Sequence, residues 1–224
     1  HRGRAQQVAV ALDADLAAAR ARFEESQRQL QTVADKLTAS RAKTYQPLTR
    51  QLVKLLRELG IGDAVLQVDA RKITCGPTGA DEIEILFSAN KGIAPRSLED
   101  VASGGEFSRL MFCVKYVMAE KTALPTLVLD EIDTGVSGEI AIQLGKMMKA
   151  MAQRHQLITI SHLPQIAARG DQHYLVYKDN SHRKTTSEVK VLQTEERVEE
   201  IAKMIGGARP SELARASARE LMAG

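Results

Sequence analysis

The stretch Val101-Ala102-Ser103-Gly104-Gly105-Glu106-Phe107-Ser108-Arg109 places two glycines where a helix is expected to begin. Each glycine in a first turn weakens a helix by roughly 1 kcal/mol, which suggests that another group approaches this backbone closely. Free N–H groups at a helix start, together with the helix dipole, favour an anion. The hydroxyl of Ser103 can donate to a phosphate, and Glu106 completes an S-x-x-E capping box. Taken alone, the stretch is also consistent with nothing more than a capped helix.

A second stretch, Leu129-Asp130-Glu131-Ile132-Asp133-Thr134-Gly135-Val136-Ser137-Gly138, follows the apolar run 126–129. Ligands of open parallel sheets bind at the carboxyl ends of strands. An aspartate there can hold Mg²⁺, usually through water, and a neighbouring glutamate can orient and deprotonate an attacking water. An isolated Asp-Glu pair is more often a polar loop, but the glycine-punctuated loop up to Gly138 favours the functional interpretation.

The third stretch, Ser161-His162-Leu163-Pro164-Gln165-Ile166-Ala167-Ala168, follows the apolar run 157–160. A helix is expected over 138–154, and a strand–helix–strand unit of this length predicts two parallel strands. Parallel strands would bring His162 to the same edge as Asp130. A histidine there can contact a γ-phosphate or polarise the water, whereas the simpler alternative is a loop histidine with a local partner.

An apolar residue recurs every seven positions in the first part of the chain, at Leu16, Phe23, Leu30 and Leu37. Leu12, Ala19, Ser26 and Val33 occupy the companion positions, so the segment 8–43 reads as one strand of a coiled coil. Such a helix cannot bury its apolar stripe alone and is expected to need a partner helix; the alternative is a helix lying on its own domain. Pro47 is predicted to interrupt it, with a second helix over 48–59 ending at Gly60.

The remaining elements are read from alternation and turn residues. Strands are predicted at 65–68 and 83–87 around the loop 75–79, and at 174–178 and 188–192 around a polar turn. Two short helices, 197–205 and 211–222, are expected to close the chain.

The composition indicates a globular, helix-rich protein and excludes a membrane span. The 224 residues are 44% apolar and 26% charged, with 4% aromatic residues and no tryptophan. No apolar run approaches the roughly 20 residues that a membrane span needs, and the start lacks the apolar core of a signal peptide. The absence of an initiating methionine suggests a fragment. Cys75 and Cys113 lack metal-ligand spacing and are expected to be reduced core thiols of a cytoplasmic protein.

The charge of the chain is unevenly distributed. Residues 2–60 hold 11 Lys/Arg and 6 Asp/Glu, a net +5, whereas the whole chain is +3 and the remainder therefore −2. A basic extension is compatible with DNA phosphates, and an ordinary solvated helix face is the alternative. The expected contacts are Arg41, Lys43, Arg50, Lys54 and Arg57.

Together the three quoted stretches closely resemble the C-terminal head half of the bacterial RecN family, SMC-like DNA-repair ATPases of the ABC type. The resemblance covers essentially the whole chain, and D-E-I-D-T-G-V-S-G followed by S-H-L-P-Q-I-A-A is not the transporter pattern. Phe107, Leu129 and Ser161 depart from the residues expected there, without changing the expected chemistry.

The resemblance implies an α/β fold: the C-terminal lobe of an ABC-type ATPase head, with a parallel sheet and flanking helices, over 46–224. A strand of an antiparallel coiled-coil arm would precede it over 1–45. Two heads would sandwich two ATP molecules with Mg²⁺. Asp130 would serve the metal, Glu131 would be the catalytic base and His162 a γ-phosphate sensor.

The resemblance also assigns residues to partners. Ser103, Gly104, Gly105 and Glu106 would form the signature motif that meets ATP on the opposite head, and Asp133 and Ser137 would lie at the head–head interface. The N-terminal half of the same protein would supply the Walker A and Q-loop, DNA would be a partner, and the protein would be cytoplasmic and nucleoid-associated.

The 224 residues contain no G-x-x-x-x-G-K-[ST] sequence, the loop that cradles nucleotide phosphates. Two alternatives to a RecN-like ATPase therefore stay open. One is the nucleotide-binding domain of an ABC transporter, which the heptads and Glu106 in place of glutamine argue against. The other is a non-enzymatic coiled-coil scaffold with relic ATPase motifs.

Overall fold

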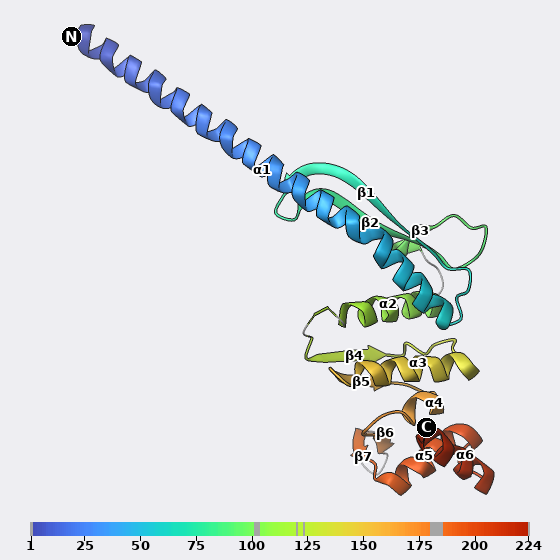
Figure 1. The fold of residues 1–224 in the computed structure, drawn as a ribbon. Coiled ribbons are helices and arrows are strands. Elements are labelled where there is room, and N and C mark those ends of the chain that lie inside the picture. The colour runs from blue at the N-terminus through green and yellow to red at the C-terminus, as the bar shows by residue number, and fades with distance from the viewer. Residues whose placement is uncertain (1, 101–103, 120, 123, 180–185, 224) are drawn as a thin grey trace. The chain divides into compact units, whose positions relative to one another are not determined.

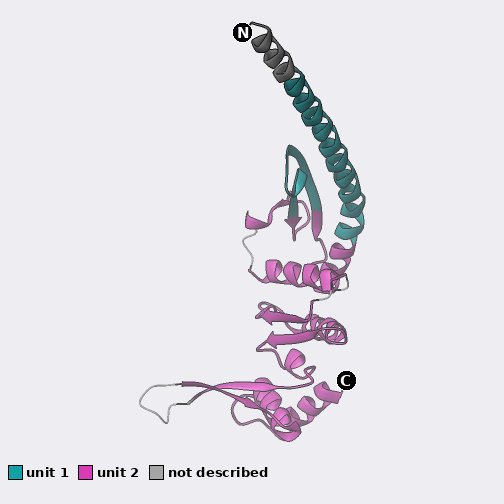
Figure 2. Ribbon diagram, turned by 90° about the vertical axis from the view of Figure 1, so that its left-hand side faces the viewer, with its two compact units in different colours: residues 1–50, 67–86 teal, residues 51–66, 87–224 magenta. Residues whose placement is uncertain are grey.

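The computed structural model describes residues 2–100, 104–119, 121–122, 124–179 and 186–223. The chain divides into two compact units (Figure 2). Unit 1 comprises residues 1–50 and 67–86, and unit 2 comprises residues 51–66 and 87–224. Within the described residues, no helix is both long enough and apolar enough to cross a bilayer.

The first helix, α1, runs without a break over Arg2–Glu58 (Figure 1). The prediction that Pro47 separates two helices is therefore wrong. Proline removes one helical hydrogen bond, the one its N–H would donate to the carbonyl of Lys43. Both residues are exposed, so water can take the place of the missing donor and the helix continues through the position.

A two-stranded hairpin of β1 (Val65–Gly76) and β2 (Gly79–Ser88) seats its turn on α1 within unit 1. The Thr38 hydroxyl donates to the carboxylate oxygens of Asp81 at 2.7 and 2.8 Å. Arg41 Nη2 donates to the carbonyl of Thr78 at 2.8 Å, and Arg41 Nη1 lies 3.4 Å from Asp81 Oδ2. Both strands are longer than predicted, because ladder hydrogen bonds carry them into polar sequence that lacks the alternation of a half-buried strand.

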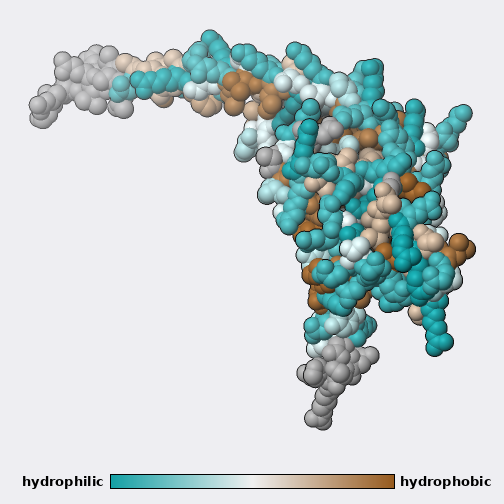
Figure 3. Space-filling view, turned by 60° about the horizontal axis from the view of Figure 1, so that its bottom comes forward, coloured by the Kyte–Doolittle hydropathy of each residue, from teal (hydrophilic) through white to brown (hydrophobic). Residues whose placement is uncertain are grey.

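The hairpin contacts one flank of α1 and leaves the heptad stripe largely open. Ala34 is buried, and Leu37, the last member of the stripe, lies against Gly79 at the hairpin turn. The large apolar residues of the stripe from Leu16 to Val33 are exposed, with Phe23 63% and Val33 63% accessible. Figure 3 shows apolar residues among polar ones along this helix.

We predict that Asp81→Ala loosens the hairpin from α1. Its side chain is only 4% exposed, and removing it takes away the acceptor that joins the Thr38 hydroxyl to β2, at a cost of about 1–3 kcal/mol. Thr38 keeps only the carbonyl of Ala34 in its own helix, and Arg41 keeps the carbonyl of Thr78. Hydrogen exchange over residues 67–86 should accelerate. Glu82→Ala, at an exposed neighbouring position, is the matched control, and equal exchange in both variants would contradict the prediction.

The core of unit 2 is a strand–helix–strand unit beside a second helix. Strand β4 (Thr126–Asp130) is followed by α3 (Gly138–Met151) and β5 (Gln156–Ile160), and α2 covers Gly104–Ala119. β4 and β5 pair in parallel from Thr126↔Gln156 to Asp130↔Ile160, which confirms the prediction. The largest buried side chains of this core lie on α2, β4, α3, the end of α1 and the turn directly after it: Leu110, Phe112, Leu129, Leu144, Leu52, Leu56 and Leu59.

The end of α1 is held against α3 by a glycine in the left-handed region. Gly60 has φ 83°, and a Cβ there would lie 2.3 Å from Cδ1 of Ile140. Glycine is therefore required both for the turn and for the close approach. The predicted stop at Gly60 is confirmed, since α1 ends two residues before it.

A histidine ties the far end of α2 to the starts of both strands. His155, next to β5, places Nδ1 2.6 Å from the carbonyl oxygen of Leu124 and Nε2 3.0 Å from that of Ala119. Ala119 is the last residue of α2, so this ring bridges a carbonyl of the last turn to the segment that enters β4.

The two cysteines have different environments. Cys113 on α2 is fully buried, and burial raises the pKa of its thiol to about 12. Cys75 on β1 is partly exposed, so the expectation of a core thiol is wrong for this residue. The position along the strand explains the difference, because Cys75 lies near the hairpin turn, beyond the buried part of β1.

The rest of unit 2 is a hairpin and a helical pair. β3 (Arg96–Ser97), which adjoins β2, and a 3₁₀ turn over Leu98–Asp100 precede α2. After β5 come α4 (Pro164–Ala167), the antiparallel pair β6 (Tyr174–Asp179) and β7 (Thr186–Val191), then α5 (Thr194–Gly206) and α6 (Glu212–Ala223). Ile201, Ala202 and Ala218 are buried among α4, α5 and α6.

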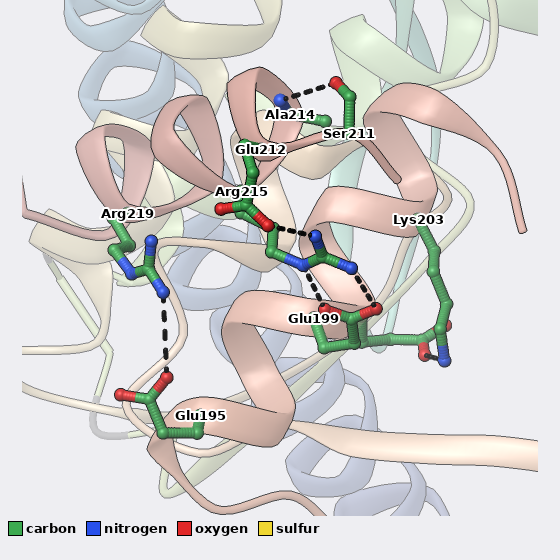
Figure 4. A network of polar contacts seen from close by, with 9 residues as sticks. Glu195, Glu199, Lys203, Ser211, Glu212, Ala214, Arg215 and Arg219 are labelled. Atoms are coloured by element: carbon green, nitrogen blue, oxygen red, sulfur yellow. Dashed lines mark hydrogen bonds and ion pairs between the residues drawn. The ribbon is translucent and has the colours of Figure 1, made fainter. Parts of the chain in front are cut away.

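Ion pairs join α5 to α6 (Figure 4). Arg215 of α6 bridges Glu199 of α5 at 2.8 Å and Glu212 of its own helix at 2.6 Å. These carboxylates, by hydrogen bonding, raise the pKa of the Arg215 guanidinium further above its already high value. The predicted hairpin and terminal helices are thus confirmed, with boundaries shifted by a few residues.

Candidate functional site

The carboxyl ends of β4 and β5 lie side by side and carry the acidic and histidine residues expected of a site. Asp130 ends β4 opposite Ile160, the last residue of β5. The backbone N–H of Glu131 then donates to the carbonyl of Ile160 at 3.1 Å, which extends the pairing by one residue. Asp130, Glu131 and His162 are therefore gathered at one edge, as predicted.

One face of this strand pair is bare. Leu127 and Leu129 are buried, whereas Val128, Ile158 and Ile160 are about half exposed, at 54%, 47% and 54%. Asp130 alternates with the same outward set. Parallel strands are normally covered on both faces. We therefore expect another layer of structure to pack on the outward face that carries Asp130.

Glu131 adopts a backbone conformation that is uncommon for its residue type. Its φ of 46° is the only positive value among the described non-glycine residues. A left-handed residue costs on the order of 1–2 kcal/mol, and such strain is concentrated at functional sites. Thr134 stabilises the turn, because its N–H and its hydroxyl both donate to the carbonyl of Glu131, at 3.3 and 2.9 Å. The side chain of Glu131 is left exposed at the strand end.

Asp133 points inward and joins the two strand ends. Its side chain is 1% exposed. Its Oδ2 accepts from the Ser161 hydroxyl at 2.5 Å and from the backbone N–H of His162 at 3.3 Å. The ring of His162, 65% exposed, has Nδ1 3.6 Å from the same oxygen. Sequence reasoning gave Ser161 no role of its own; only its position directly before His162 could have drawn attention to it.

The start of α2 lies against the loop after β4. A Cβ on Gly105 would lie 2.9 Å from the carbonyl oxygen of Thr134, whereas a Cβ on Gly104 would meet nothing within 4 Å. The group that approaches Gly105 closely is therefore the Thr134 backbone of the same unit. Of the two glycines, only Gly104 has open space beside it. Glu106 is partly buried in the first turn of α2. Ser103, and with it the predicted capping box, lies outside the described residues.

Ser137 stands at the start of α3 with an uncommitted hydroxyl. It is exposed, has an extended backbone, and makes no side-chain capping hydrogen bond. It therefore lies on the surface of the loop whose interior is held by Asp133.

The donor set at this edge suits a cation held largely by groups other than protein side chains. Among the described residues, no three His, Cys, Asp or Glu side chains gather closely enough to hold a metal ion. Mg²⁺ usually keeps several waters and binds through one or two carboxylates plus substrate phosphates. One exposed carboxylate, that of Asp130, matches this requirement and does not match a closed structural metal site.

Comparison with known proteins shows what this chain is related to. It is 38% identical to the DNA repair protein RecN of Xylella fastidiosa strain 9a5c over 192 residues, which is 84% of this chain and 34% of that protein. It is 39% identical to RecN of Deinococcus radiodurans over 198 residues, 88% of this chain and 34% of that protein.

The chain belongs to the RecN family. It spans about a third of the length of these relatives. RecN of Streptomyces coelicolor is 42% identical over 157 residues, 70% of this chain and 27% of that protein. No family model matches the chain.

Solved structures support the fold of a head with a coiled coil. The Smc head domain of Pyrococcus yayanosii, solved with a coiled coil and joint, aligns with a TM-score of 0.52 at 19% identity over 71% of this chain and 29% of that one. The Smc head of Pyrococcus furiosus, solved with an extended coiled coil, gives 0.52 at 16% identity over 74% and 39%. The RecN-like segment therefore has the ABC-type head fold that its motifs predict, and the transporter alternative is not favoured.

We predict that Gly105→Ala destabilises the RecN head and that Gly104→Ala does not. Alanine at 105 must displace the Thr134 backbone or the start of α2, at a cost of about 1–3 kcal/mol for overpacking. Thermal unfolding without nucleotide should show a lower Tm for Gly105→Ala alone. The two substitutions have the same intrinsic helix preference, so equal Tm values would show that the close contact is absent.

Proposed function

We propose that this segment supplies the C-terminal half of an ATP-hydrolysing head in a RecN-type DNA double-strand break repair protein. The observation that carries the proposal is the edge formed by β4 and β5, where Asp130, Glu131 and His162 lie at adjacent strand ends beside a bare sheet face. A phosphate-cradling loop is absent from the 224 residues. In the proposed protein, the N-terminal half brings the Walker A loop and the Q-loop and covers that face.

The roles follow from the positions of the side chains. Asp130, exposed at the end of β4, would hold Mg²⁺ beside the phosphates of ATP. Glu131, turned outward by its left-handed backbone, would accept a proton from the attacking water. The backbone N–H of His162 is held by Asp133, and its exposed ring would contact the γ-phosphate.

A second head would complete the site. Ser103, Gly104, Gly105 and Glu106 are proposed to meet ATP bound to the opposite head of a homodimer. Support comes from the open space at Gly104 and from the anion-binding character of a helix start. The exposed Ser137 and the loop held by Asp133 are proposed to lie at the interface between heads.

The helix α1 is proposed to be the returning strand of an antiparallel coiled-coil arm. The hairpin covers one flank around Ala34, Thr38 and Arg41, and the stripe from Leu16 to Val33 stays exposed. A partner helix can therefore pack on the stripe before the hairpin is reached.

The proposed function is tested by Glu131→Gln in the full-length protein. The amide is nearly isosteric and leaves Asp130 in place but cannot take up a proton, so we expect ATP binding to persist and turnover to fall by roughly 10²–10⁴-fold. Glu139→Gln, the same change at an exposed position in the first turn of α3, is the control and should leave turnover unchanged.

Turnover in Glu131→Gln above about a third of the wild-type rate would remove Glu131 from the role of base. Absence of turnover in the wild-type full-length protein would instead favour the scaffold alternative.

We also propose that DNA phosphates contact the basic side of the arm and its root, and that this brings the protein to the nucleoid. Four of the expected contacts, Lys43, Arg50, Lys54 and Arg57, are exposed. Arg41 is committed to Asp81 and Thr78, and Arg57 donates to the carbonyl of Gly62 at 3.2 Å. Arg50 donates within its own helix, to Gln46 Oε1 at 3.2 Å, so the test below uses Lys43, Arg50 and Lys54, whose side chains are not tied to another element among the described contacts.

We predict that reversing Lys43, Arg50 and Lys54 to Glu weakens DNA binding by the full-length protein and makes it less sensitive to salt. Contacts to phosphates alone give sequence-independent affinity that falls with salt through release of counterions. The control reverses Lys91, Lys146 and Arg154, which are exposed and lie outside residues 2–60 of the sequence, so that the net charge is the same. Equal affinity and equal salt slope in both triple variants would show that the arm residues form an ordinary solvated helix face and do not contact DNA.

A further inference from the structure

The buried carboxylate of Asp133 makes its contacts with one oxygen only. Its Oδ2 accepts from the Ser161 hydroxyl and the His162 amide, while Oδ1 is buried and has no hydrogen-bond partner among the described groups. Burying a carboxylate with one oxygen unsatisfied costs at least 1–3 kcal/mol. A stability role alone would be served better by a neutral residue, so the group needs another reason to be there.

Ser161 completes a continuous hydrogen-bonded link across the strand ends. Its hydroxyl donates to Asp133 Oδ2 and accepts from the backbone N–H of Leu163 at 3.0 Å. The backbone N–H groups on either side of the His162 Cα are therefore both anchored. That of His162 donates to Asp133, and that of Leu163 donates to Ser161. His162 has no other polar anchor among the described contacts, and its ring is mostly exposed.

The other end of the link reaches the loop of Glu131. Val136 N–H donates to the carbonyl of Asp133 at 3.0 Å, and Thr134 closes the turn onto Glu131. The backbone from Glu131 to Val136 is thus one hydrogen-bonded turn that holds the Asp133 carboxylate at a fixed place. A shift of His162 relative to Glu131 would break at least one bond of this set.

We propose that Asp133 and Ser161 are positioning residues that hold His162 at a set distance from Glu131 within the same head. This role rests on the proposed ATPase function and deepens it. Asp133 then acts through its buried carboxylate inside its own head, and the side chains that this loop offers to a second head are exposed ones such as Ser137.

The test is steady-state ATPase kinetics on the full-length protein. A misplaced catalytic group lowers the rate of the chemical step more than the affinity. For Asp133→Asn and Ser161→Ala we expect kcat to fall about tenfold, with less than a threefold change in KM for ATP. Ser161→Thr keeps a hydroxyl and should restore most of the loss.

A double-mutant cycle separates positioning from general stability. If Asp133 acts through His162, then Asp133→Asn should cost less than twofold in a His162→Ala background. Thr126→Ala is the matched control, because it removes a side-chain bond of 2.9 Å to Gln156 at the opposite end of the same strand pair. It should leave kcat unchanged.

Hydrogen exchange gives a readout that needs no turnover. In Ser161→Ala, the amides of residues 162–163 should exchange faster while those of α3 stay protected. Faster exchange with an unchanged kcat, or a tenfold loss that persists in the His162→Ala background, would overturn the positioning role. Failure of the ATPase proposal itself would appear separately, as an absence of turnover in the wild-type full-length protein.

Discussion

The parallel pairing of β4 with β5 is the interaction on which the site depends. It brings two segments separated by about thirty residues to one edge, and it sets which of their side chains face outward. Because side chains alternate along a strand, a slip of one residue would turn Asp130 toward α3 and expose Leu129. The register from Thr126↔Gln156 to Asp130↔Ile160 therefore determines both the core and the chemistry.

Sequence reasoning predicted the elements whose periodicity is strong. The two apolar runs with a helix between them were enough to predict parallel strands, and from these the shared edge of Asp130 and His162. The head fold and the relation to RecN could be predicted because the three motifs occur in this order along the chain. What periodicity could not show was contact between distant elements: the seat of the hairpin on α1, or the approach of Gly105 to Thr134.

Two wrong predictions have a common physical origin. Each applied a general preference of a residue type, helix breaking by proline and burial of cysteine, at a position that is open to solvent. Pro47 removes a hydrogen bond from the helix, and at this exposed position water can serve the freed carbonyl. Cys75 belongs to a residue type that is usually buried, yet it lies where β1 extends beyond its core. Ser161 was passed over for the opposite reason, since a serine is unremarkable until the structure shows a buried carboxylate opposite it.

The helix α1 is used on two sides by different partners. Its flank at Ala34, Thr38 and Arg41 is taken by the hairpin through hydrogen bonds and an ion pair, whereas its stripe is apolar and open. Because Leu37 belongs to the stripe but touches the hairpin turn, the two surfaces meet at this residue. The position marks where packing by a second helix must give way to packing by the hairpin.

The unequal burial of the two cysteines makes the segment readily addressable by thiol chemistry. Thiolates, not thiols, react, and the buried Cys113 stays protonated at neutral pH and out of reach of reagents. Cys75, partly exposed beside the groove between the hairpin and α1, is left as the one thiol of these 224 residues that a maleimide dye would label. A fluorophore there would sit next to the stripe of the arm without any engineered cysteine, and its emission would report on whatever packs beside it.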